Sequence, residues 1–374
     1  MKTALVHDWL VTMGGAECVL EQMYMLYPQA PIYTLFSDPK SISRTVLKDA
    51  KIINSSLQHC PFIRKIYRKI PQLFPLAIEE FDMRGYNVVL SSSHAVAKGV
   101  LTDAKTCHIS YVHTPMRYIW DLTHEYLKQA KFPWLLEQYT KHIFHGLRQW
   151  DIVSSFRPDY YIANSHFIKN RIHKIYRRDA EVIYPPVNLS EKVYTDKENY
   201  FVAASRHVPY KNILLITESF ARMPDKKLII LGDGPDSEKV RRIANKAENI
   251  SYLGYQPHSE LMSIIGKAKA FIFAAEEDFG LMPVEAQSLG TPVIAYGVGG
   301  ACETIQNGVT GIFFYSQTAE AITQAVQEFE HNEDRFDPQK VAEYSKKFSI
   351  CRFQEEMKAF IDKKFKEFHS KDYL

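Results

Sequence analysis

The sequence predicts an α/β protein made of two Rossmann-like, doubly wound domains. Its 374 residues are more than a single hydrophobic core usually serves. Apolar segments of strand length alternate with amphipathic helical patterns, which is typical of parallel sheets covered by helices on both faces. The alternation stops at Pro185-Pro186 and the polar stretch that follows, and it begins again at about residue 200. Two sheets joined by a linker are therefore expected.

The first half opens with an apolar segment, Thr3–His7, which we interpret as a strand followed by a glycine turn. Apolar residues then recur at helical spacing over about 16–27, and Pro28 ends that helix. Long helices rich in polar and aromatic residues are expected over 120–155. Further strands are predicted at Ile32–Leu35, Val88–Ser91, Cys107–Val112, Tyr160–Asn164 and Ala180–Tyr184.

The second half repeats the alternation with five strands and five helices. The strands are expected over residues 200–204, 227–231, 250–253, 269–273 and 292–295. The helices are expected over residues 211–222, 236–247, 258–266, 283–289 and 300–306. The predicted domains are residues 1–187, residues 199–349 and a C-terminal helix, 350–374, that returns to the first domain.

Composition excludes several classes of protein. Apolar residues make up 46% of the chain and charged residues 24%, as in ordinary soluble globular proteins. The five cysteines show no C-x-x-C spacing, so we expect reduced thiols and no zinc site. The first residues lack a secretory signal, and no apolar run is long enough to span a bilayer. A cytoplasmic protein that at most touches a membrane is therefore expected.

Charge is distributed unevenly along the chain. Residues 1–185 are net basic and residues 186–349 net acidic. A basic first half favours an anionic surface or acceptor as its partner, with plain solvation as an equally good interpretation.

One basic segment is residues 63–76, where four cations alternate with apolar side chains. In a helix this pattern would give a basic and an apolar side, as in a segment that lies among lipid headgroups. The alternative is that the apolar side belongs to the core. A second basic segment, residues 169–178, could lie on the same domain.

The most informative stretch runs from Glu277 to Glu285 and reads Glu-Asp-Phe-Gly-Leu-Met-Pro-Val-Glu. It follows a predicted strand, and Gly280 lets the backbone approach a ligand. Pro283 fits the first helical position, so the unpaired N–H groups of residues 281–284 would suit an anion. The two carboxylates suit the vicinal hydroxyls of a sugar or ribose. An acidic residue that merely complements the helix dipole is the alternative.

A second motif, Ser-Arg-His-Val-Pro-Tyr-Lys-Asn, spans residues 205–212 directly after a strand. Arg206 and Lys211 would lie at the carboxyl end of that strand, where open α/β sheets bind ligands. Paired cations there suit a diphosphate, although a single surface cation closing a loop would look the same. After the next strand, Gly232-Asp-Gly234-Pro leaves room for a ligand or forms a simple tight turn.

In this order and spacing, the motifs resemble glycosyltransferase family four, a large retaining family with the GT-B fold. The resemblance covers most of the chain. In the second half it continues through Gly299-Gly300-Ala-x-Glu303-Thr and Gly308-x-x-Gly311. In the first half it includes Gly14-Gly15-Ala-Glu17, His113 and Asn164-Ser165.

Within that family the chain is most similar to bacterial mannosyltransferases of O-antigen and capsule assembly. Three stretches of the first half carry this similarity: His7-Asp8-Trp9, Ser91-Ser-Ser-His94-Ala-Val-Ala-Lys98-Gly99, and Tyr111-Val-His113-Thr-Pro-Met-Arg117-Tyr followed by Trp120-Asp121.

The resemblance implies two domains that face each other across a cleft, with the acceptor on the side of the first and the nucleotide sugar on the second. Arg206 and Lys211 would bind the donor diphosphate and take up leaving-group charge. Glu285 would hold the ribose hydroxyls. Glu277 would hold the transferred sugar together with backbone N–H groups of Phe279, Gly280, Leu281 and Met282.

Four further residues complete the expected site. Gly14 and Gly15 would let the first domain approach the phosphates, and Gly234 would leave room for the donor. His113 would face the sugar or the acceptor. One departure from the family pattern lies inside this site, because His207 stands where a leucine is usual.

The implied chemistry needs no cofactor beyond the donor. Fixed cations and helix-end N–H groups would stabilise the charge that develops on the departing nucleoside diphosphate. No Asp-x-Asp is placed to hold a diphosphate-bound metal, so none is expected. In a retaining reaction the departing phosphate can take the acceptor's proton, so no general base is required. His113 is the candidate if one exists, and a structural histidine is the alternative.

We therefore expect transfer of mannose from GDP-mannose to a lipid-linked or polysaccharide glycan, at the inner face of the cell membrane if the basic segments bind lipid. The alternatives are rhamnose, glucose or N-acetylglucosamine as the donor sugar, or a non-catalytic binding subunit. An NAD-dependent oxidoreductase is disfavoured because no Gly-x-Gly-x-x-Gly opens either half. Nucleic-acid binding is not expected, because no ordered basic motif accompanies the aromatic residues.

Overall fold

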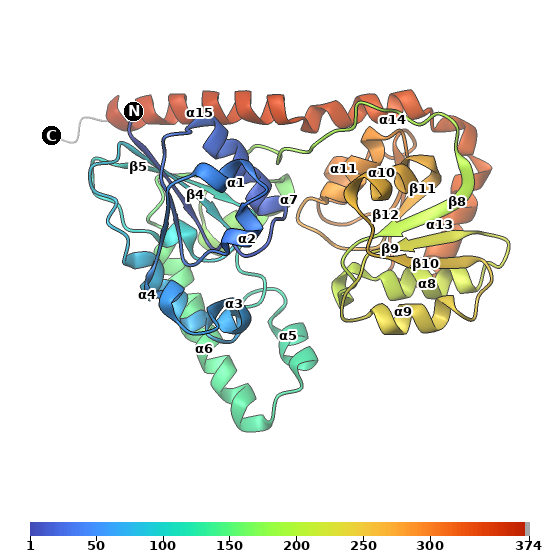
Figure 1. Cartoon of the computed structure of the whole chain (residues 1–374), viewed down its shortest axis with the longest axis horizontal. Coiled ribbons are helices and arrows are strands. Elements are labelled where there is room, and N and C mark those ends of the chain that lie inside the picture. The colour runs from blue at the N-terminus through green and yellow to red at the C-terminus, as the bar shows by residue number, and fades with distance from the viewer. Residues whose placement is uncertain (371–374) are drawn as a thin grey trace. The chain divides into compact units, whose positions relative to one another are not determined.

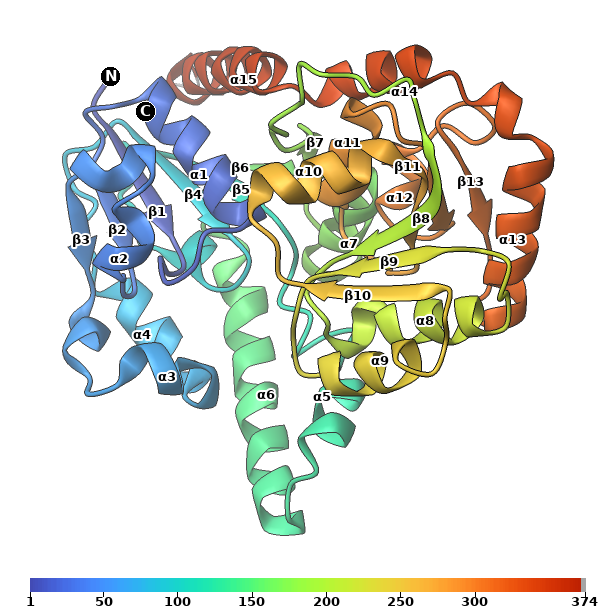
Figure 2. The same cartoon turned by 45° about the vertical axis from the view of Figure 1, so that its right-hand side comes forward.

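The computed structural model describes residues 1–370, apart from the side chain of residue 129. The chain forms two compact units, each built on its own parallel sheet (Figure 1 and Figure 2). The first unit is Met1–Pro186 together with the described residues from Cys351 onward, and the second is Val187–Ile350.

The first unit has a seven-stranded sheet in the order β3-β2-β1-β4-β5-β6-β7, and all its pairings are parallel. Its strands are β1 Thr3–His7, β2 Ile32–Thr34, β3 Ile52–Asn54, β4 Val88–Ser93, β5 Cys107–Val112, β6 Tyr160–Ala163 and β7 Glu181–Val182. Its helices are α1 Gly15–Leu26, α2 Pro39–Ile42, α3 Ile63–Ile66, α4 Phe74–Glu79, α5 Thr123–Ala130, α6 Trp134–Ser154, α7 His166–Tyr176 and α15 Ile350–Ser370.

The C-terminal helix α15 belongs to the core of this first unit. Phe353, Met357, Ile361 and Phe368 recur on one face of the helix and are buried. They share a hydrophobic cluster with β1, β4 and β5. The helix is therefore held by apolar packing against the sheet that the first residues of the chain begin.

The second unit has a six-stranded parallel sheet in the order β10-β9-β8-β11-β12-β13. Its strands are β8 Glu198–Ala204, β9 Leu228–Leu231, β10 Ile250–Gly254, β11 Ala268–Phe273, β12 Val293–Tyr296 and β13 Gly311–Phe314. Its helices are α8 Ile213–Ala221, α9 Ser237–Ala244, α10 His258–Lys267, α11 Leu281–Ser288, α12 Ala301–Thr304, α13 Ala319–His331 and α14 Pro338–Ser345. Both units thus have the doubly wound arrangement that the sequence predicts.

Residues 63–76 do not form one amphipathic helix. Short 3₁₀ turns separate α3 from α4, and Pro71, which lacks an N–H group, stands between them. Ile63, Tyr67 and Phe74 are buried in the hydrophobic core, so these apolar side chains face the protein and not a membrane. The cations of the segment remain exposed. The interpretation of residues 63–76 as a continuous membrane-surface helix is wrong. Only the expectation that their cations lie at the surface holds.

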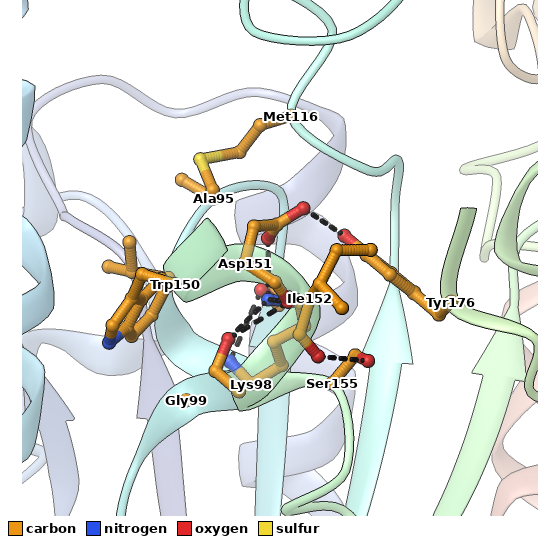
Figure 3. A network of polar contacts seen from close by, with 12 residues as sticks. Ala95, Lys98, Gly99, Met116, Trp150, Asp151, Ile152, Ser155 and Tyr176 are labelled. Atoms are coloured by element: carbon orange, nitrogen blue, oxygen red, sulfur yellow. Dashed lines mark hydrogen bonds and ion pairs between the residues drawn. The ribbon is translucent and has the colours of Figure 1, made fainter. Parts of the chain in front are cut away.

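A buried ion pair joins the first unit's sheet to helix α6 (Figure 3). The ammonium of Lys98, which follows β4, lies 2.6 Å from Oδ1 of Asp151 on α6, and both side chains are almost completely buried. Trp120 Nε1 and the Tyr176 hydroxyl donate to the other carboxylate oxygen at 2.8 and 3.0 Å. Ser154 Oγ accepts from the ammonium at 2.9 Å. This network fixes α6 against the sheet.

Every helix in the described part of the chain is either too short or too polar to cross a bilayer.

Candidate functional site

The second unit places its two most informative motifs side by side. β8 and β11 are neighbours at the point where the strand order reverses, and both strands end at the same edge of the sheet. Loop 205–212 follows β8, and loop 274–280 follows β11. This is the position at which doubly wound sheets bind their ligands.

The buried side chain of His207 anchors loop 205–212. The imidazole is fully buried, and its Nε2 lies 3.2 Å from the Leu231 carbonyl oxygen, to which it can only donate. Ser237 Oγ lies 3.0 Å from the other ring nitrogen and also accepts the Gly234 N–H, so this hydroxyl joins the ring to the neighbouring loop. Burial lowers the pKa of His207, which favours the neutral ring. The departure from leucine therefore ties the loop to β9 and α9 through hydrogen bonds.

The close packing of two loops explains why a glycine stands at position 234. A Cβ on this residue would stand only 2.5 Å from the carbonyl oxygen of His207. The His207 N–H in turn donates to the Asp233 carbonyl at 3.0 Å. The backbone of the neighbouring loop thus fills the space beside Gly234. Gly234 can contribute to donor binding only through its own backbone groups.

Lys211 and Glu277 are brought together. The ammonium of Lys211 and the carboxylate of Glu277 form an ion pair, and each side chain is only 17% exposed. Asn212 sets this contact, because it adopts a left-handed conformation (φ 55°) and its amide donates to the Ala274 carbonyl at 3.0 Å. Arg206 is exposed on the same loop, and its guanidinium forms no ion pair within residues 1–370. One cation is therefore paired and oriented, and the other is accessible to a ligand.

The loop that carries Glu277 is clamped by a glycine pair after β12. The Gly300 N–H donates to the Glu277 carbonyl at 2.8 Å, and residues 277 and 299 form a parallel bridge. A Cβ at Gly300 would overlap the backbone of Phe279, whose own ring packs at 5.4 Å from that of Phe348. The Phe279 side chain is therefore core, so only its backbone can serve a ligand.

Helix α11 begins earlier than the sequence predicts. Gly280 takes a left-handed conformation (φ 88°) as N-cap, and Leu281 is the first helical residue, so Pro283 is the third and not the first. The missing N–H of Pro283 still costs nothing there, because the first helical N–H groups have no partner within the helix. The N–H groups free for an anion are thus those of Leu281 and Met282, and Glu285 lies at the start of the second turn.

Glu285 is half-buried, and burial raises the pKa of its carboxyl, with the nearby His258 acting in the opposite direction. Gln287 is fully buried, and its amide donates to the carbonyls of Pro283 and Thr304. It ties α11 to α12 and so fixes the helix that presents Glu285.

Replacing Glu285 by glutamine should raise thermal stability while weakening binding of a nucleoside diphosphate by about ten- to a hundredfold, as for a lost charge-assisted hydrogen bond. The Glu285 carboxyl has a higher pKa in the folded protein than in the unfolded chain. The free energy of unfolding therefore falls as pH rises through the folded-state pKa. The gain in the variant should therefore be largest at pH 7–8 and vanish below the ordinary glutamate pKa. Thermal melts against pH and calorimetric titration with GDP measure both effects. Exposed Glu218 on α8 supplies the control, and unchanged GDP affinity in E285Q would contradict the ribose assignment.

The first unit gathers its own polar cluster at the point where its strand order reverses, between β1 and β4. Asp8, directly after β1, is fully buried and accepts four backbone N–H groups from residues 94–97 at 2.6–3.0 Å. Gly14 caps helix α1, and its N–H donates to the Glu17 carboxylate at 2.9 Å. Gly14 thus lies at the N-cap of α1, and Gly15 is the first residue of that helix.

His113 follows β5 and is nearly buried, and burial holds its pKa well below the usual range. Its Nε2 lies 2.8 Å from Ser92 Oγ, and Asn164 donates to its carbonyl oxygen at 3.0 Å. The structure thus places His113, Gly14 and Gly15 in the first unit and the remaining predicted site residues in the second.

Several residues of these sites could not be assigned a role from the sequence. Asn212 and Gln317 both donate to the carbonyl of Ala274, and Ser92 contacts His113, yet each reads as an ordinary polar residue. The only available signal for Asn212 is its position directly after Lys211, since asparagine tolerates the left-handed conformation.

Comparison with known proteins agrees with this geometry. Residues 188–348 match the family model described as glycosyl transferases group 1. The chain is similar to the O-antigen chain mannosyltransferase of Salmonella typhimurium, at 29% identity over 162 residues, which cover 41% of this chain and 46% of that protein. It is also similar to the GDP-mannose-dependent alpha-(1-6)-phosphatidylinositol monomannoside mannosyltransferase of Mycolicibacterium smegmatis, at 34% identity over 140 residues, covering 33% and 37%.

The chain spans about half the length of the curated relatives it matches. Among solved structures, Alr3699/HepE of Anabaena in complex with UDP superposes with a TM-score of 0.70 at 15% identity, covering 97% of this chain and 100% of that one. At this identity the likeness establishes the fold of the two units.

Proposed function

We propose that the chain transfers a hexose from a nucleotide sugar to a glycan acceptor. Its residues 188–348 match the family model of glycosyl transferases group 1, and its two units have the GT-B fold. The observation that carries this proposal is the juxtaposition of Lys211 with Glu277, beside the free start of α11, where β8 and β11 end. A cation, a carboxylate and unpaired N–H groups are what a sugar diphosphate requires.

The expected roles follow from this chemistry. Arg206 and Lys211 bind the diphosphate, and the N–H groups of Leu281 and Met282 add hydrogen bonds. Glu285 accepts from the ribose hydroxyls and Glu277 from the hydroxyls of the transferred sugar. As the anomeric bond breaks, negative charge grows on the departing phosphate, and these fixed groups stabilise it without having to reorganise.

Lys211 has two partners in this scheme. Its ion pair with Glu277 holds the ammonium at the edge of the sheet. A bound diphosphate would compete for the ammonium and leave the Glu277 carboxylate available to sugar hydroxyls. The pair thus couples arrival of the phosphates to presentation of the carboxylate.

Mannose from GDP-mannose is the donor we propose, and a lipid-linked or polysaccharide glycan is the acceptor. The support is the similarity to two mannosyltransferases, one acting on the O-antigen chain and one named for GDP-mannose and a phosphatidylinositol mannoside. We further propose that the reaction retains anomeric configuration and needs no metal, since the charged groups above suffice for the leaving group.

A panel of nucleotide sugars tests the function. Release of nucleoside diphosphate is measured for GDP-mannose, UDP-glucose, UDP-N-acetylglucosamine and a rhamnose donor, each with and without excess EDTA. GDP-mannose should be turned over fastest, and EDTA should leave its rate unchanged. A preference for a uridine donor would contradict the mannose assignment, strict dependence on added manganese would contradict the metal-free mechanism, and binding without turnover would indicate a non-catalytic subunit.

We also propose that the first unit contacts an anionic membrane that carries the acceptor. Figure 1 and Figure 2 both show α5 and the far part of α6 extending away from the rest of this unit. Apolar side chains are exposed where the two helices meet, namely Phe132, Trp134, Leu135, Leu136 and Tyr139. Aromatic and leucine side chains of this kind suit the boundary between headgroups and acyl chains. The exposed cations of residues 63–76 would add electrostatic attraction.

Flotation with liposomes tests the membrane contact. The protein should float with anionic vesicles at low salt and stay behind with neutral ones. Lys65, Arg68 and Lys69 together supply about 3 kcal/mol, at about 1 kcal/mol for each cation near the surface, so changing all three to glutamine should abolish flotation. Arg64 is kept, because it already pairs with Asp38 at 2.6 Å.

The double variant W134S/L135S should also fail to float, because it removes the apolar insertion. Exposed Tyr255 of the second unit provides the control, since Y255S should float like the parent. Equal flotation of the parent and both test variants would end the proposal.

A further inference from the structure

A line of polar side chains crosses the first unit at the reversal of its strand order. It runs from the glycine turn to His113. Glu17 accepts the Gly14 N–H and faces His7, with Oε1 lying 3.7 Å from His7 Nε2. The other nitrogen of His7 lies 3.1 Å from Ser92 Oγ, and Ser92 Oγ lies 2.8 Å from His113 Nε2. His7 and Ser92 are fully buried, so no solvent replaces these partners.

The protons along this line can be assigned by counting donors and acceptors. His7 Nδ1 lies 3.1 Å from the Ser92 carbonyl oxygen as well as from its hydroxyl. A carbonyl can only accept, so His7 Nδ1 carries a proton. This holds whether or not His7 Nε2 is also protonated toward Glu17. The pKa of Glu17 favours the ionised form, because burial, which would raise it, is outweighed by His7.

The hydroxyl proton of Ser92 then has a single possible acceptor. His7 Nδ1 is already a donor, and within the described residues the only other group within hydrogen-bond distance of the Ser92 hydroxyl is His113 Nε2. Leaving a buried hydroxyl without an acceptor costs about 1–3 kcal/mol. Ser92 therefore donates to His113 Nε2, which must be unprotonated. Burial keeps the His113 ring neutral, so its single proton lies on Nδ1.

We infer that Ser92 and His7 are positioning residues that hold His113 as the Nδ1–H tautomer, so that it donates a hydrogen bond to a substrate oxygen bound at this edge of the first unit's sheet. His113 Nδ1 forms no hydrogen bond with residues 1–370, so its proton is free for a ligand. The substrate part of this inference rests on the proposed function, whereas the tautomer does not.

The assignment decides between two roles for His113. A general base would need a lone pair on the nitrogen that faces the substrate, and the Nδ1–H tautomer offers a proton there instead. The substrate oxygen is then oriented by a neutral donor, and the acceptor's proton goes to the departing phosphate. Electrostatic catalysis of this kind depends on a donor already aimed at its acceptor, which is what the buried Ser92 contact provides.

The tautomer is tested by long-range ¹⁵N–¹H spectra of protein labelled at histidine nitrogens, with the His113 signals identified by their loss in His113→Asn. The parent should show His113 with Nδ1 protonated and Nε2 bare. Ser92→Ala should lose this fixed pattern, and Ser92→Thr, which keeps the hydroxyl, should restore it. Ser91 provides a matched control, since it is equally buried on the same strand and bonds His108 Nε2 at 2.9 Å. Ser91→Ala should leave His113 unchanged, and a protonated His113 Nε2 in the parent would overturn the inference.

Kinetics supply the second readout. An asparagine amide nitrogen stands near the position of Nδ1, whereas a glutamine amide reaches that of Nε2. His113→Asn should therefore keep at least tenfold more of kcat/KM than His113→Gln. Ser92→Ala should lower kcat/KM about tenfold, as expected for one hydrogen bond. The reverse order for the two His113 variants would contradict the donor role. If no nucleotide sugar is turned over, the proposed function fails, and the spectra still decide the tautomer.

Discussion

Replacing Lys211 or Arg206 by alanine should lower turnover by about ten- to a thousandfold, the range for one lost contact to charge that develops in the transition state. Lys211 should show the larger loss in kcat, because its ammonium is held at the edge of the sheet by Glu277 and loses little freedom when it binds a phosphate. Arg206 is exposed, and much of its effect should appear in donor affinity. Single-turnover and steady-state rates of nucleoside diphosphate release separate the two effects.

Lys267 provides the control for both variants. It is exposed on α10 and pairs with Glu198 at 3.1 Å, so its loss should change turnover by less than twofold. If Arg206→Ala and Lys211→Ala both kept activity within twofold of the parent, neither cation would bind the diphosphate, and the proposed site would be wrong.

The second large effect is on stability. Replacing Lys98 by methionine should cost about 3–5 kcal/mol in the free energy of unfolding of the first unit, because it leaves the buried Asp151 without its cation. The double variant K98M/D151L should cost less than the sum of the single changes, because neither charge then remains unpaired. It should not recover the parent's stability, since Trp120 and Tyr176 would lose their acceptor. Denaturant unfolding followed by Trp fluorescence measures the changes.

The exposed pair Arg242–Glu238 on α9 serves as the comparison. Both side chains are about three-quarters exposed, so Arg242→Ala should change stability by less than about 0.5 kcal/mol. A loss below about 1 kcal/mol for Lys98→Met would contradict the view that this network fixes α6 against the sheet.

Most of the fold could be predicted from the sequence because parallel sheets leave a strong local signal. Strands buried on both faces read as apolar runs, and β1 and β5 have the bounds that the sequence predicts. The short strand β3 was missed, because three half-buried residues carry no distinct pattern. The strand β13 was missed because it follows a loop that reads as a motif of glycines and not as a strand boundary.

The site could be predicted only as far as residue type and position at a strand end allow. Lys211 and Glu277 were both expected near the donor, but their ion pair depends on Asn212 and its bond to the residue that follows β11, a contact between residues 62 apart. The helix start at Leu281 was missed because Pro283 suits the first position best, whereas the left-handed Gly280 lets the helix begin earlier. The polar line through His7 and Ser92 depends on strand register, which a sequence alone does not give.

The most direct test of the central claim is to find which backbone segments a bound nucleotide sugar protects from hydrogen exchange. Hydrogen–deuterium exchange should be measured by mass spectrometry with and without saturating GDP-mannose. Peptides that contain residues 205–212 and 277–285 should exchange more slowly with the ligand, because the diphosphate binds the loop after β8 and the unpaired N–H groups that begin α11. Ligand binding with no protection of either segment, or protection confined to other parts of the chain, would show that the donor site lies elsewhere.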